Sequence, residues 1–118
     1  MLIDSHCHLD FPDLAEDRAG VLQRARDAGV GLMLTISTYV AKFDNYRSLS
    51  EAHADVLFTV GTHPHNAGQE PDVAAETLAK LAEHPRCVAI GEAGLDYHYD
   101  NSPREAQAEG LSNHIVAA

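Results

Sequence analysis

The sequence contains few of the residues that typify secreted or membrane proteins. Only two of its 118 residues are cysteines, Cys7 and Cys87, too few for a disulfide scaffold, so a reducing compartment is the simpler interpretation. No run of about 18 apolar residues is present, which argues against a membrane span. The opening "MLIDSH" has neither the basic region nor the long apolar stretch of a secretory signal. We therefore expect a cytoplasmic protein.

Positive charge is also scarce. Eight Lys and Arg residues against eighteen Asp and Glu residues give a formal net charge of −10. A surface of this charge repels nucleic acid at long range, so a nucleic-acid substrate would need a local positive centre such as a bound metal. Hydrophobic residues make up 45% of the chain, which is enough to bury the core of one modest domain.

Apolar segments alternate with segments of helical spacing along the whole chain. One expected helix begins at Pro71, and Ser102 is expected to cap another. The expected strands are residues 1–9, 30–38, 56–64 and 87–97, and the expected helices are residues 17–29, 42–55, 71–85 and 102–118. Four βα units in succession predict an α/β fold with a parallel sheet, and apolar strands such as "CVAI" predict a sheet covered on both faces.

Two architectures fit this pattern: an open doubly wound sheet and part of a (β/α)8 TIM barrel. The first strand is followed by "SHCHLD" and not by a glycine-rich phosphate loop, which weakens the nucleotide-binding open sheet. A whole barrel needs about 250 residues. The chain stops within a helical pattern, so we expect residues 1–118 to be the N-terminal half of a larger barrel, with only its first four βα units.

The segment "DSHCHLD" is the first candidate for chemistry. Residues two apart on a strand face the same way, so His6 and His8 can share one metal ion, although two polar residues at a strand end would look the same. Asp4 and Asp10 can orient an imidazole from behind. Cys7 should point to the opposite face, as a small buried residue and not a ligand.

The segment "GEAGLDYH" is the second candidate. Glu92 ends an apolar strand between Gly91 and Gly94, where a carboxylate is costly unless it is paired or bound. A glutamate at the carboxyl end of a barrel strand can bridge two cations. A carboxylate that caps the next loop is the alternative.

Two further histidines, His63 and His65, flank Pro64 in "GTHPHN" at another strand end. They can hydrogen-bond a phosphate or polarise a leaving group, or simply cap turns. His53, His84 and His114 lie in or next to predicted helices, where we assign them no function.

Four segments in order, "DSHCHLD", "VGTHPHNA", "AIGEAGLDYHYD" and "SPREAQ", resemble the signature segments of the TatD family of metal-dependent deoxyribonucleases. The resemblance implies a TIM barrel with one or two divalent metals, with Zn, Mn, Mg, Ni and Co not distinguished. It implies cleavage of phosphodiester bonds, usually in DNA, by a metal-activated water. By position, His6 and His8 match the family's first metal ligands, Glu92 its bridging glutamate, and His63 and His65 a loop near the substrate.

One part of the family pattern has no counterpart in this chain. The family supplies two further histidines and a late aspartate that acts on the attacking water, and His114 precedes the first of these without replacing it. The catalytic residue is therefore unknown here. Two alternatives to a DNase stay open: an amidohydrolase-like enzyme acting on C–N or ester bonds, and a truncated metal-binding fragment without activity.

Overall fold

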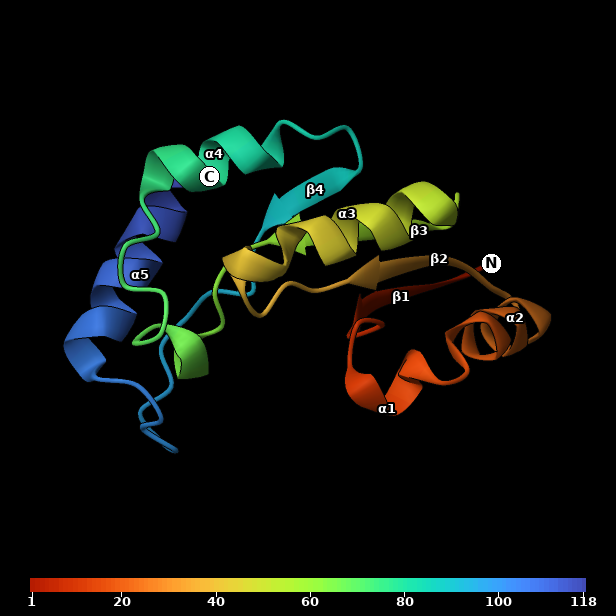
Figure 1. The fold of residues 1–118 in the computed structure, drawn as a ribbon, viewed down its shortest axis with the longest axis horizontal. Coiled ribbons are helices and arrows are strands. Elements are labelled where there is room, and N and C mark those ends of the chain that lie inside the picture. The colour runs from red at the N-terminus through yellow and green to blue at the C-terminus, as the bar shows by residue number, and fades with distance from the viewer.

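A computed structural model describes all residues, 1–118, and its centre is a four-stranded parallel sheet in the order β1-β2-β3-β4 (Figure 1). The strands are β1 (Leu2–Cys7), β2 (Val30–Thr35), β3 (Val56–Val60) and β4 (Cys87–Ile90). The helices are α1 (Pro12–Ala15), α2 (Arg18–Asp27), η1 (Val40–Lys42), α3 (Phe43–Ala52), η2 (Pro64–Asn66), α4 (Ala75–Ala82) and α5 (Arg104–Ala117). The predicted alternation of strands and helices is confirmed.

The helices α2, α3 and α4 each pack against the strand that follows them in the chain. α2 contacts β2, α3 contacts β3, and α4 contacts both β4 and α5. Gly29, with φ of +91°, turns the chain out of α2 into β2, a conformation that glycine adopts without strain. None of the helices has the length and apolar character needed to cross a lipid bilayer.

Two apolar clusters hold the helices on the sheet. Leu9, Leu22, Met33 and Val56 form the first, beneath α2. The second joins η1, β3 and α4 through Val40, Val60 and Leu78. Burial on this scale is the main favourable term in folding, and it fixes the strand ends from which the candidate site is built.

Two predicted helix starts are wrong. α4 begins at Ala75 and not at Pro71, because residues 71–72 form a turn and Ala74 is extended, and Asn113 donates a hydrogen bond to the Val73 carbonyl. Ser102 does not cap α5. Its hydroxyl accepts from Gly68 N and donates to His65 O, so it holds the loop that contains η2.

The prediction of a sheet covered on both faces is also wrong for the outer strands. Leu2 and Ile3 in β1 and Val88 in β4 are more than half exposed, whereas Met33 in β2 and Phe58 in β3 are buried. β1 and β4 each have a neighbouring strand on one side only. The outer strands therefore leave apolar surface and backbone groups open to solvent.

Candidate metal centre

The carboxyl ends of parallel strands meet at one edge of a sheet, and three potential ligands lie at this edge. His6 is in β1, His8 follows its last residue, and Glu92 follows β4 by two residues. One ligand atom from each of the three lies within 4.8 Å of the other two. The structure therefore brings together the residues that the sequence pattern proposed as metal ligands.

Hydrogen bonding leaves one nitrogen of His8 free to bind a cation. His8 Nδ1 lies 3.1 Å from the carbonyl oxygen of Ile36, which can only accept. In the neutral imidazole the ring proton is therefore on Nδ1, and Nε2 keeps its lone pair. A backbone carbonyl behind the ring is the usual way in which a protein fixes the tautomer and direction of a metal-binding histidine.

The two oxygens of the Glu92 carboxylate face different imidazoles. Oε2 is 3.5 Å from His6 Nε2, and Oε1 is 3.3 Å from His63 Nε2. The Glu92 side chain is 29% exposed, so the carboxylate sits at the mouth of the site and not in the core. One oxygen is thus next to the His6 and His8 pair while the other faces the His63 ring.

A row of hydrogen bonds across three strands fixes the backbone around Glu92. Its N–H donates to the carbonyl of Ser37 at 2.9 Å. The Thr59 hydroxyl donates to the carbonyl of Gly91 at 2.6 Å and accepts from Ser37 N at 2.9 Å. These residues follow or end β2, β3 and β4, so the position of Glu92 depends on the whole sheet edge.

The second histidine pair lies beside this group. His63 Nδ1 accepts the backbone N–H of His65, so a neutral His63 carries its proton on Nε2, which faces Glu92. Burial lowers the pKa of His63, and the imidazoles of His65 and His8 add to this effect against the opposing charge of Glu92. His63 is therefore a neutral hydrogen-bond donor at pH 7.

His65 is oriented by a carboxylate. Its Nε2 is hydrogen-bonded to Asp96 Oδ2. Burial alone would raise the pKa of Asp96, but the backbone N–H groups of Tyr99 and His98 and the His65 ring together lower it. The carboxylate is thus ionised at neutral pH, and it holds the imidazole in place at the rim of the site.

Two of three neighbouring residues have different surroundings from those expected. Asp4 accepts from the backbone N–H of His6 and does not contact an imidazole. Both carboxylate oxygens of Asp10 are buried without a hydrogen-bond partner. Cys7 behaves as expected: burial, with the charges of Asp4 and Asp10, raises the pKa of its thiol to about 12, and the thiol donates to Leu34 O.

The sequence patterns did not predict two features of the site. His114 was assigned no function, yet it is buried in α5, where its Nε2 accepts from Thr62 N, next to His63. A groove of about 340 Å³ also opens beside the histidines, with Phe11, Tyr39 and Lys42 among its walls. Tyr39 and Lys42 follow the second strand, and that position at the site edge was the signal that could have found them.

The donor set suits a divalent metal. Two imidazoles and one carboxylate are ligands that Zn, Mn, Ni and Co accept, and Mg is possible where most ligands are oxygens. The tautomer of His8 and the short spacing of the three ligand atoms are compatible with coordination of one cation. His6, His8 and Glu92 would supply three ligands to such a cation.

Comparisons with known proteins agree with this chemistry. The family described as "TatD related DNase" matches residues 3–118. The chain is 38% identical to the "3'-5' ssDNA/RNA exonuclease TatD" of Erwinia tasmaniensis over 118 residues, which are 99% of this chain and 46% of that protein. It is 37% identical to the "uncharacterized metal-dependent hydrolase YcfH" of Escherichia coli K12, covering 97% of this chain and 43% of the relative.

A solved structure shows the same fold. The crystal structure of YjjV, a TatD homologue from Escherichia coli K12, superposes with a TM-score of 0.89 at 34% identity, over 99% of this chain and 46% of that one. The fold is therefore of the TIM-barrel type, with the first four βα units present. The chain spans about half the length of the relatives that it matches.

Proposed function

This chain belongs to the TatD-related DNase family, and on that basis we propose that it is part of a metal-dependent hydrolase that cleaves phosphodiester bonds in single-stranded nucleic acid. The observation that carries the proposal is the convergence of His6, His8 and Glu92 within 4.8 Å. The names of the relatives, an ssDNA/RNA exonuclease among them, support nucleic acid as the substrate class. The two free thiols agree with a cytoplasmic location.

We further propose that residues 1–118 form the N-terminal half of a TatD-like barrel. A divalent cation held by His6, His8 and Glu92 would lower the pKa of a water molecule and offset charge on the phosphate oxygens. The chain's own groups have complementary roles. Neutral His63 presents an Nε2–H that can donate to a phosphate or leaving-group oxygen, and His65, oriented by Asp96, lines the same groove.

Titration and turnover test this proposal together. The chain and its His6→Ala, His8→Ala double variant are titrated with Zn²⁺ and Mn²⁺ by calorimetry, and each is incubated with labelled single-stranded DNA, a carboxylic ester and an amide. We expect metal binding that the double variant loses, and any DNA cleavage by the chain should be abolished by chelation. Lys80→Gln, a change far from the site, is the control that should alter neither.

Different failures have different meanings. Cleavage that survives both chelation and the double substitution would refute a metal-dependent mechanism. Preference for the ester or the amide would favour the amidohydrolase-like alternative. Stoichiometric metal binding without turnover would support an inactive metal-binding unit for this chain by itself.

A further inference from the structure

The groove beside the metal centre has a composition unlike that of the rest of the chain. Three loops line it: the one after β1, the one after β2 and the one after β3. The chain has eighteen acidic residues, yet none of the nine residues that line the groove is Asp or Glu. Lys42, one of only two lysines in the sequence, lies at its wall. A groove of this kind accepts a negatively charged ligand that the acidic surface elsewhere repels.

Aromatic rings from two of these loops also line the groove. Phe11 is 38% exposed, and its ring stacks on that of His8, with centroids 4.6 Å apart and planes 14° from parallel. Tyr39 is held from the other loop, where its hydroxyl donates to Gln69 at 3.1 Å. Phe11 belongs to neither apolar core cluster, and its exposed part can act as a stacking surface for a planar ligand.

The wall that carries Lys42 is rigidly held. Glu70 accepts the backbone N–H groups of Val40 and Ala41, each at 2.9 Å, and also the hydroxyl of Thr62 at 2.7 Å. The Lys42 ammonium lies 5.1 Å from the centre of the Tyr39 ring. Because these bonds fix η1, Lys42 within it and Tyr39 immediately before it are positioned before any ligand arrives, which reduces the entropy lost on binding.

We propose that this groove is a nucleotide subsite in which one base of a single strand stacks on Phe11 and Tyr39 while Lys42 contacts an adjacent phosphate. The inference rests on the proposed function for the identity of the substrate, and it adds the residues that would bind it. A strand in this position would reach the histidines directly, because His8, His63 and His65 line the same groove. A duplex keeps its bases stacked inside, so the subsite selects single strands.

The test measures binding without hydrolysis. Fluorescein-labelled dT8 is titrated with the chain in EDTA at 20 mM salt, followed by anisotropy, so that neither metal nor turnover contributes. We expect Phe11→Ala to weaken binding about 5- to 150-fold, the range measured for loss of base stacking. Phe11→Tyr keeps a ring and should restore the affinity. Against an octamer that lacks its nucleobases, Phe11→Ala should have no effect.

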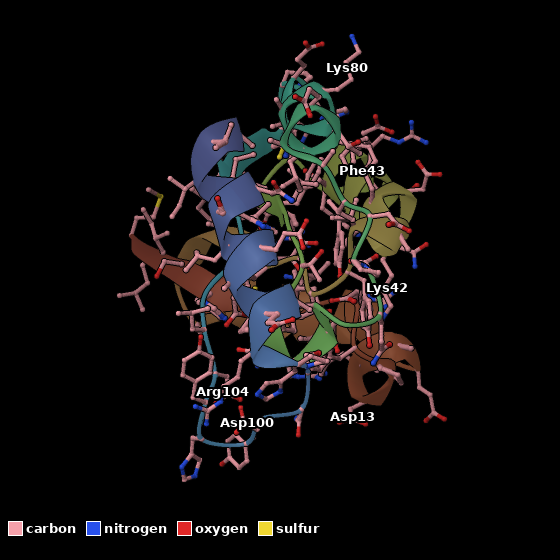
Figure 2. All side chains as sticks on the ribbon, turned by 90° about the vertical axis from the view of Figure 1, so that its left-hand side faces the viewer. Asp13, Lys42, Phe43, Lys80, Asp100 and Arg104 are labelled. Atoms are coloured by element: carbon pink, nitrogen blue, oxygen red, sulfur yellow. The ribbon has the colours of Figure 1, made fainter.

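Lysine 42 has a matched control in the only other lysine. Figure 2 shows Lys80 at the far end of the molecule from Asp13 and well separated from Lys42. Lys42→Gln should reduce the slope of log K against log salt by about 0.7, the value for one phosphate contact on a single strand. Lys80→Gln should leave the slope unchanged, and Phe11→Ala should lower the affinity without altering the slope.

The outcomes separate the subsite from the proposed activity. No binding of dT8 by the unaltered chain at 20 mM salt, or equal binding by Phe11→Ala and the unaltered chain, would overturn the inference. Base-dependent binding that needs Phe11, in a chain that hydrolyses no phosphodiester, would sustain the subsite while the hydrolase proposal fails. If the chain hydrolyses bis(p-nitrophenyl) phosphate but binds dT8 equally well with and without the Phe11 ring, the subsite would be refuted while the hydrolase proposal would stand.

Discussion

Replacing Gly61 with alanine should disturb the metal centre without touching a ligand. A Cβ at this position would lie 2.6 Å from the carbonyl carbon of Gly91 and 2.8 Å from its Cα and oxygen. The obstacle is backbone, which cannot rotate away as the end of a flexible side chain can. Restoring an ordinary contact of 3.4 Å requires the ends of β3 and β4 to separate by about 0.8 Å.

The expected cost has two parts. Overpacking at a well-packed position costs about 1–3 kcal/mol of the free energy of unfolding. Gly91 immediately precedes Glu92, so the same shift moves the carboxylate, and coordination tolerates displacements of only about 0.5 Å. We therefore expect zinc affinity to fall about 10- to 100-fold, as it does when a group that positions a ligand is lost.

Urea denaturation followed by circular dichroism, with zinc titration against a chromophoric competitor, measures both effects. Gly110→Ala is the matched control. Its Cβ would have only Ala67 at 4.0 Å, and within α5 the change should stabilise the chain by about 0.5–1 kcal/mol. If Gly61→Ala keeps both the stability and the zinc affinity of the unaltered chain, the close approach of β3 and β4 does not position Glu92.

Three further predictions concern other parts of the fold, and each is tested by urea denaturation. Asp55→Asn removes the bidentate partner of Arg26, whose hydrogen bond lowers the pKa of Asp55 below 3.8. The loss of stability caused by this substitution should therefore be full above pH 5 and should shrink as the pH falls below 3.8. A loss that does not depend on pH would contradict this. Glu70→Gln places an amide N–H against a donor from η1 or Thr62, so it should lower the free energy of unfolding by about 1–3 kcal/mol. An unchanged free energy of unfolding would mean that η1 is held by packing alone. Leu78→Ala removes a fully buried side chain and should lower the free energy of unfolding by about 2–5 kcal/mol. Val88→Ala, at a half-exposed side chain, is the control and should lower it far less. Equal losses would refute the second core cluster.

The order of elements could be predicted from the sequence because it depends on periodicity within short windows. An apolar run such as "LMLTI" predicts a strand without reference to the rest of the fold. A glycine such as Gly29 predicts the end of a helix, and its positive φ at the end of α2 agrees with this. The spacing of His6 and His8 likewise needs only local geometry to place both rings near each other. Glu92 could be predicted because a carboxylate that follows an apolar strand is energetically costly unless it is paired or bound.

Contacts between distant segments could not be predicted in this way. Nothing near Ser102 in the sequence shows that its hydroxyl holds Gly68 and His65, so its cap-like position before Pro103 was misleading. His114 lies at an ordinary helical position, and only the fold brings its Nε2 to Thr62 N. Exposure of β1 and β4 is a property of their place in the sheet and not of their apolar residues.

The curvature of the sheet explains how ligands from its two outer strands meet. β1 and β4 are separated by β2 and β3, and neighbouring strands lie about 4.8 Å apart, so a flat sheet would hold the outer strands about 14 Å from each other. Yet the ligand atoms of His6 and Glu92 converge within 4.8 Å. The sheet must bend as a barrel wall bends, and the chain after β4 must return across it, which the hydrogen bond from Glu92 N to Ser37 O shows directly. The close approach at Gly61 and the bonds of Thr59 hold the residue after β4 against the end of β3. A substitution that flattens the sheet there would separate the ligands and abolish metal binding while leaving every ligand residue in place.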